Sequence, residues 1–170
     1  NQLEAILKNS GELTDDLSLL RIGFQESDPN PTKEETLQAL NFAYAQSKAL
    51  YKSGESKKAL DILLSAYSPN IHAPKFNRLL GVLSYQNKDY AMAVEVLSKY
   101  LKEKPESIPL LYYLSIAFRK IGNYQKSIET GKKIFDLKND HIGNLINLTD
   151  LHRLNSETAL AQFYFSQASL

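Results

Sequence analysis

The feature that most constrains the fold is a pattern of small residues that recurs every 34 residues. Two columns of this pattern contain only small side chains. They are Ser47, Gly81, Ser115 and Thr149, and Ala59, Ala93, Ser127 and Ala161. The register holds without insertion across four successive units. Because self-similarity at a period of this length is the signature of repeat architectures, the chain is predicted to build one supersecondary unit four times.

Each unit contains two amphipathic stretches that are separated by a short turn. In the third unit, Leu111, Leu114 and Phe118 lie at i, i+3 and i+7, which places them on one face of a helix. Gly122 then suits the left-handed C-cap that ends this helix, and a second helix follows from Tyr124. The small columns fall where the two helices of a hairpin approach closely. The sequence therefore predicts antiparallel helix hairpins.

This pattern resembles the tetratricopeptide repeat family, whose unit has a Leu-Gly pair, a tyrosine, two alanines and a late proline. The second unit matches best, through Leu80, Gly81, Tyr90, Ala93, Leu97 and Pro105. The resemblance implies an all-α fold, a right-handed α-solenoid of antiparallel helix hairpins. The expected repeats form one continuous solenoid over 40–170, with units at 40–73, 74–107, 108–141 and 142–170.

Residues 1–39 lie outside this register and have an interpretation of their own. An apolar stripe at helical spacing precedes a proline-rich break at 27–31. We expect a degenerate helical hairpin there, followed by a linker. Thr32 and Glu35 then form a capping-box signature, which predicts a helix from about 33 to 52.

Composition disfavours several classes of function. The chain has no cysteine, which excludes disulfides, cysteine nucleophiles and thiolate metal sites. Of its three histidines, His72, His141 and His152, none pairs with another at i+3 or i+4, and His152 takes the register position of Phe118, which predicts a core residue. No phosphate-binding loop or nucleophile elbow is present. We expect no enzymatic activity, no cofactor and no metal.

Charge and hydropathy leave the cellular compartment open. The formal net charge is +1, so no global field indicates nucleic acid or membrane. No run of about 18 apolar residues predicts a transmembrane helix, so membrane insertion is not expected. No targeting segment is visible in a sequence that begins at Asn1, and cytoplasm and periplasm both fit.

The resemblance implies that the first helix of each unit lines a concave groove. The positions that match the groove of the family are Tyr44, Lys48, Tyr51, Lys52, Lys75, Arg78, Tyr85, Tyr112, Ile116, Arg119, Lys120 and Arg153. Tyrosine offers a rigid apolar surface with a hydroxyl group, and arginine binds carboxylates with two hydrogen bonds. We expect a protein or peptide partner with acidic and hydrophobic residues. In the alternative interpretation, the lysines only solvate the face and the tyrosines pack between helices.

The C-terminal end of the array motivates a second functional hypothesis. The last predicted helix carries Phe163, Tyr164 and Phe165, and no polar capping helix follows. Three explanations fit these aromatic residues. Either the natural chain continues, or a second copy covers the end, or the aromatic rings fold inward. These residues are therefore a candidate end-to-end interface for a structural assembly module or a homo-oligomer. Nucleic-acid binding by the groove is less favoured, because the base-selecting code of related helical arrays is absent.

Overall fold

The computed structural model describes residues 31–169, and every regular element in this range is an α-helix. The eight described helices are α3 (Lys33–Lys52), α4 (Ser56–Ala66), α5 (Pro74–Gln86), α6 (Tyr90–Glu103), α7 (Ile108–Lys120), α8 (Tyr124–Leu137), α9 (Ile142–Leu154) and α10 (Thr158–Ala168). The hairpin that we predict before residue 31 lies outside the described residues. No described helix is long and apolar enough to span a bilayer.

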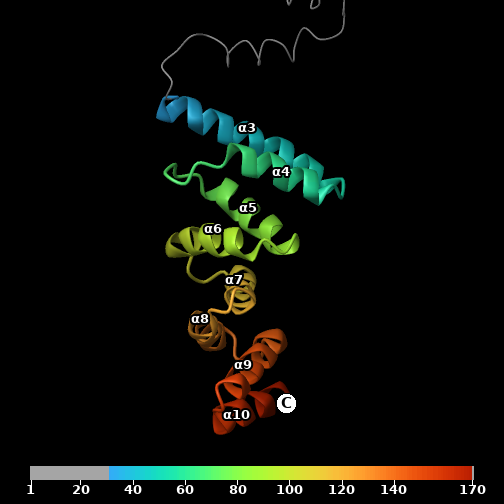
Figure 1. The fold of residues 1–170 in the computed structure, drawn as a ribbon, viewed down its shortest axis with the longest axis vertical. Helices are drawn as coiled ribbons and strands as arrows, with labels where there is room; N and C mark the ends of the chain where they lie inside the picture. Colours follow the sequence, from blue (N-terminus) through green and yellow to red (C-terminus); the bar gives the residue numbers. More distant parts are fainter. Residues whose placement is uncertain (1–30, 170) are drawn as a thin grey trace, which may run out of the picture. The chain divides into compact units, whose positions relative to one another are not determined.

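The helices pair as successive hairpins within the compact unit that contains residues 36–170. Figure 1 shows these hairpins following one another in chain order, from α3 and α4 to α9 and α10. Contacts of α4 with α5, α6 with α7, and α8 with α9 join each hairpin to the next. From α4 onward, each helix starts 34 residues before the corresponding helix of the next hairpin. The predicted all-helical repeat fold is therefore confirmed.

The same turn closes the first helix of every hairpin. One residue per hairpin has a positive φ, and these residues are Gly54 (88°), Lys88 (67°), Gly122 (80°) and Ser156 (60°). The amide of the next residue donates to a carbonyl five residues before it, as in Asp89 to Ser84 at 2.8 Å and Asn123 to Phe118 at 2.8 Å. This is the Schellman arrangement. It confirms Gly122 as a left-handed C-cap.

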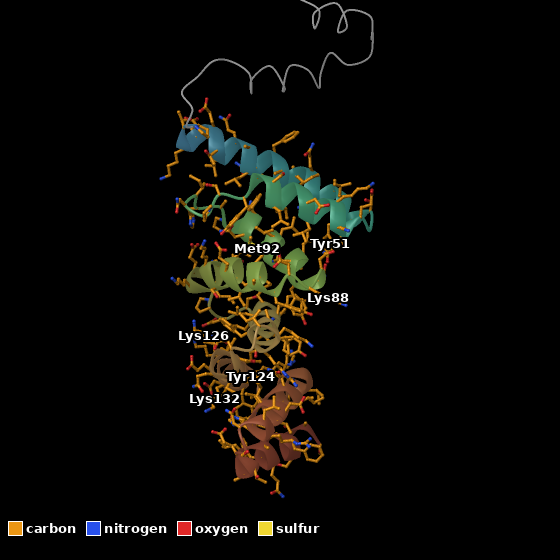
Figure 2. The ribbon with its side chains drawn as sticks, viewed as in Figure 1. Tyr51, Lys88, Met92, Tyr124, Lys126 and Lys132 are labelled. Atoms are coloured by element: carbon orange, nitrogen blue, oxygen red, sulfur yellow. The ribbon has the colours of Figure 1, made fainter. Side chains whose placement is uncertain are left out.

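Replacement of Lys88 by glycine is expected to raise the free energy of unfolding by roughly 0.5 kcal/mol. A residue with a Cβ atom costs about 1 kcal/mol in the left-handed region, and the greater backbone freedom of glycine offsets part of this gain. Lys132, within α8, is the control, because Lys132→Gly should lower stability by about 1 kcal/mol. Figure 2 labels both lysines. Urea unfolding of both variants checks the result, and a loss of stability in Lys88→Gly contradicts it.

The core follows the columns that the sequence predicts. Leu80, Leu114 and Leu148 of the leucine column are buried, whereas Gln46, which holds this position in the first unit, is exposed. His152 is buried and stacks on Tyr164, with ring centroids 5.4 Å apart. The prediction that His152 is a core residue is confirmed.

The helix starts also follow the sequence. The Thr32 amide donates to the Glu35 carboxylate at 2.8 Å, and the Glu35 amide donates to the Thr32 hydroxyl at 3.2 Å. The bonds that the Glu35 carboxylate accepts from Thr32 lower the pKa of Glu35, because they stabilise its ionised form. The predicted capping box is therefore present, and α3 covers the range that was predicted for the helix it opens.

Candidate functional site

The residues predicted for the groove lie on the first helices of the four hairpins, α3, α5, α7 and α9. We call the side that carries them the first-helix face. Seven of these side chains are exposed, namely Lys48, Tyr51, Lys52, Lys75, Arg78, Lys120 and Arg153. Five are half-buried, namely Tyr44, Tyr85, Tyr112, Ile116 and Arg119. The face therefore offers exposed cations beside aromatic side chains that the fold holds in place.

Contacts made by tyrosine side chains join α3 to α5 and α5 to α7 on this face. Gln86 Nε2 donates to the Tyr51 hydroxyl at 3.1 Å, which links the ends of α3 and α5. The Tyr85 ring stacks on Tyr113 of α7, with centroids 4.5 Å apart. Burial, together with the neighbouring tyrosines, raises the pKa of Tyr85. These tyrosines pack between helices, as the alternative interpretation expects, and also leave part of their surface exposed.

Tyr112 makes the corresponding contact between α7 and α9. A Cβ atom at Gly143 would lie 2.8 Å from the Tyr112 hydroxyl, so the ring lies directly against the first turn of α9. The same ring faces His141, with centroids 4.9 Å apart. The Nδ1 atom of His141 accepts a hydrogen bond from the Asn144 amide at 3.1 Å and so caps α9. Side chains of the predicted face thus connect all four first helices.

Arg119 is not a free cation. Its guanidinium donates to Asn147 Oδ1 at 3.1 Å and to Asp150 Oδ2 at 3.1 Å, both on α9. Asn147 in turn donates to the Ser115 hydroxyl at 3.0 Å, and Ser115 bonds to Ser127 of α8. This network joins the first-helix face to the polar centre of the packing between the third and fourth hairpins. Arg119 therefore serves the packing of hairpins, and Asp150 offsets its charge.

The other cations of the predicted set make no ion pair with any described residue. Lys48 lies over the Tyr44 ring, with Nζ 5.8 Å from the centroid. Lys75 and Arg78 project from α5 and are exposed. Four of these six cations, Lys48, Lys52, Lys75 and Arg78, lie on α3 and α5, whereas Lys120 and Arg153 lie on α7 and α9.

Sequence reasoning missed two residues of this face, Asn147 and Tyr113. Asn147 is almost fully buried, with an exposed fraction of 2%. An asparagine on the helix face that packs against the columns of small residues could have indicated this role, because buried amides require hydrogen-bond partners. Tyr113 lies one register unit before Asn147 and makes the equivalent contact to the preceding hairpin.

The end of the array requires one correction. Tyr164 is buried, because its ring packs edge-on against the Phe135 ring, with centroids 5.5 Å apart, and stacks on His152. It therefore adds little to an end surface, in contrast to the prediction. Phe163 and Phe165 remain 45% and 63% exposed. Beside Phe165 is a hollow of about 280 Å³ that is bounded by Thr149, Arg153, Thr158, Ala161, Gln162 and Phe165.

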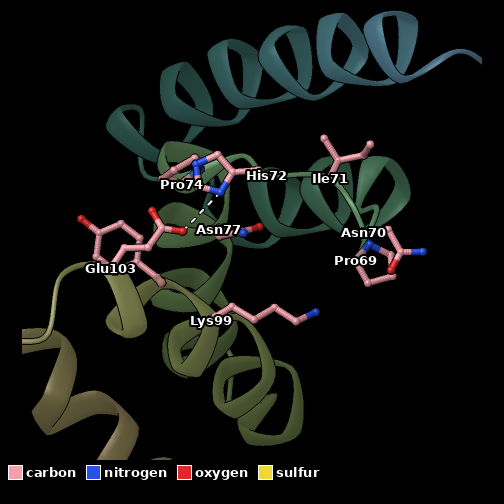
Figure 3. A pocket seen from close by; sticks show the side chains of 9 residues that line it. Pro69, Asn70, Ile71, His72, Pro74, Asn77, Lys99 and Glu103 are labelled. Carbon is pink, nitrogen blue, oxygen red and sulfur yellow. Dashed lines mark ion pairs between the residues drawn. The ribbon is translucent and has the colours of Figure 1, made fainter.

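A second hollow of about 200 Å³ lies between the α4–α5 loop and α6 (Figure 3). His72 and Glu103 form an ion pair across one side of it, with Nδ1 and Oε1 3.2 Å apart. Lys99 donates to the Tyr67 hydroxyl and to Glu95, and the bonds that Glu95 accepts from Lys99 and Tyr67 hold its pKa below the usual value. No group of three metal-ligating side chains occurs among the described residues.

No protein-family model matches the sequence, and no curated protein matches it. Solved structures of MamA do share its architecture. A mutant form of MamA is 18% identical with a TM-score of 0.71, and the match covers 76% of each chain. MamA from Desulfovibrio magneticus RS-1, beginning at its residue 41, is 20% identical with a TM-score of 0.65, over 76% of this chain and 73% of that one. The fold is that of a tetratricopeptide-like helical-repeat solenoid.

Proposed function

We propose that this chain is a non-enzymatic scaffold whose first-helix face binds an acidic and apolar segment of another protein. The observation that carries the proposal is the group of cations without an ion pair on α3 and α5, Lys48, Lys75 and Arg78, with Lys48 lying over the partly exposed Tyr44 ring. Cations without an ion-pair partner are available for carboxylates, and fixed aromatic rings supply apolar contact at low entropic cost. The repeat architecture, which presents extended surfaces to partners, also supports it.

The test is affinity capture of partners from the native cell, followed by quantitative mass spectrometry. A Lys75→Glu, Arg78→Glu variant is expected to reduce recovery of specific partners at least tenfold, because it places two carboxylates opposite the acidic segment. The matched control is Lys126→Glu, Lys132→Glu, which makes the same charge change on exposed residues of α8, a second helix of a hairpin. Figure 2 labels both of these lysines.

Circular dichroism should show equal helix content in both variants, since none of the four side chains is buried. Equal recovery of partners by the first variant and the wild type would refute binding through the first-helix face. Equal losses in both variants would show that binding depends only on the total charge of the chain.

A second candidate function is assembly through the end of the array, either as a homo-oligomer or by docking into a larger complex. The exposed rings of Phe163 and Phe165, beside the hollow at the end of α9 and α10, favour it. For self-association, light scattering should show oligomers that a Phe163→Glu, Phe165→Glu variant converts to monomers. A wild-type chain that is monomeric at about 100 μM would exclude the homo-oligomer and leave docking to another protein.

A further inference from the structure

The composition of the chain determines which side chains an oxidant attacks. The sequence has ten tyrosines, no cysteine, no tryptophan and a single methionine, Met92. Cysteine and methionine otherwise consume most oxidants, and tryptophan is the other side chain that loses one electron readily. Because these residues are absent or nearly so, a one-electron oxidant that reaches this protein leaves its radical on tyrosine.

Four of the tyrosines gather where the second hairpin packs against the third. Tyr85 of α5 is at their centre, and its ring stacks on Tyr113 of α7 with centroids 4.5 Å apart and 19° between the ring planes. Tyr90 of α6 meets the Tyr85 ring edge-on, with centroids 6.0 Å apart. Tyr112 is a further neighbour, because it adds to the effect of burial in raising the pKa of Tyr85. An electron moves readily between aromatic rings in contact, so oxidation of one tyrosine spreads over this group.

The stacked pair has the arrangement that radical coupling requires. Two phenoxyl radicals join through ring carbons beside the hydroxyl group, and the new bond forms between the faces of the rings. Among the described residues, Tyr85 and Tyr113 are the two tyrosines that stack face to face, since the other tyrosine contact, Tyr85 with Tyr90, is edge-on. Both rings of the stacked pair are half-buried, so they reach solvent and have room to turn as the bond forms.

We propose that Tyr85 and Tyr113 are a site of oxidative cross-linking, at which hydrogen peroxide and a haem catalyst join the second and third hairpins through a dityrosine bond. Each phenol gives up one electron and its hydroxyl proton, and the two radicals form a carbon–carbon bond between their ortho positions. The hydrogen atoms at these two carbons then move to the oxygens and restore both phenols. The two electrons and two protons that were released reduce one molecule of hydrogen peroxide to two of water.

The cross-link would stabilise the array, because it joins α5 to α7 across α6 and so restricts the unfolded chain. It is independent of both candidate functions, since it requires neither a partner on the first-helix face nor assembly through the end of the array.

The test treats the full chain with hydrogen peroxide and a small haem peptide, and measures dityrosine fluorescence. Mass spectrometry of a protease digest should show the peptide that contains Tyr85 joined to the peptide that contains Tyr113, with the loss of two hydrogen atoms. The chain should stay monomeric on a denaturing gel, and the oxidised chain should unfold at a higher urea concentration than the untreated one.

Tyr85→Phe and Tyr113→Phe should each reduce the dityrosine yield at least tenfold, because phenylalanine keeps the stacked ring but forms no phenoxyl radical. The matched control is Tyr124→Phe on α8, which removes a phenol that is 42% exposed and stacks on no described tyrosine. Figure 2 labels Tyr124. This control should leave the yield unchanged, and circular dichroism should show equal helix content in all three variants.

An undiminished yield in either Tyr85→Phe or Tyr113→Phe would overturn the proposal, as would the absence of dityrosine in the wild-type chain. Cross-links that map to other tyrosines, or that form only between molecules and increase with protein concentration, would overturn it as well.

Discussion

Replacement of Gly81 by valine is expected to lower the free energy of unfolding by about 3 kcal/mol, because it overpacks the centre of the second hairpin. Gly81 is buried on α5, where α5 meets α6. A Cβ atom there would lie 2.5 Å from Leu97 Cδ2 and 3.1 Å from Val96 Cγ2. Leu97 and Val96 are themselves fully buried, so neither can move aside without displacing other core residues.

Urea unfolding measures this loss, and Ala91→Val is the matched control. Ala91 is exposed on α6, so its replacement tests only the weaker helix propensity of valine, about 0.6 kcal/mol. Similar losses in the two variants would show that propensity, rather than the close approach of the helices, makes glycine necessary at residue 81.

The second large effect is expected at Arg119, where Arg119→Glu should lower the free energy of unfolding by about 2 kcal/mol. The substitution removes the donors to Asn147 and Asp150 and places two carboxylates side by side. The Arg119 and Asp150 side chains are 30% and 39% exposed, so solvent screening keeps the loss below that of a buried pair.

A double-mutant cycle isolates this interaction. Asp150→Arg should destabilise the chain alone, and the combined charge exchange should recover more than half of the summed loss. Additive losses, measured by urea unfolding, would show that the pair contributes nothing to the packing of α7 against α9. Because substitution of Arg119 changes stability, tests of partner binding should leave this residue intact.

Local sequence patterns were sufficient to predict the helices and several of their ends. The capping box at Thr32 and Glu35 fixed the start of α3, because its hydrogen bonds join residues three positions apart. The column with Gly54 and Gly122 likewise places Lys88 at an equivalent turn, and its backbone has the same positive φ. Each of these features depends on a short stretch of chain that the sequence displays directly.

Pairings between hairpins were less accessible to sequence reasoning. Arg119 and Asp150 are 31 residues apart, and the sequence assigns Arg119 to a solvent-facing groove, although the structure pairs it with Asp150. Tyr164 was grouped with its exposed neighbours, whereas its ring turns inward against Phe135. Periodicity gives the face of a helix but not the direction of a long side chain, so partners across hairpins follow only from the three-dimensional packing.

The central claim, that the first-helix face binds a partner protein, is tested most directly by thiol protection. Because the chain has no cysteine, Asn41→Cys on α3 and Lys132→Cys on α8 each introduce a single exposed thiol and leave the cations of the face intact. The rate of maleimide labelling is measured with and without a partner purified by the capture experiment. We predict that the partner slows labelling at position 41 at least tenfold and leaves labelling at position 132 unchanged. Protection at position 132 alone, or at neither position, would contradict the claim.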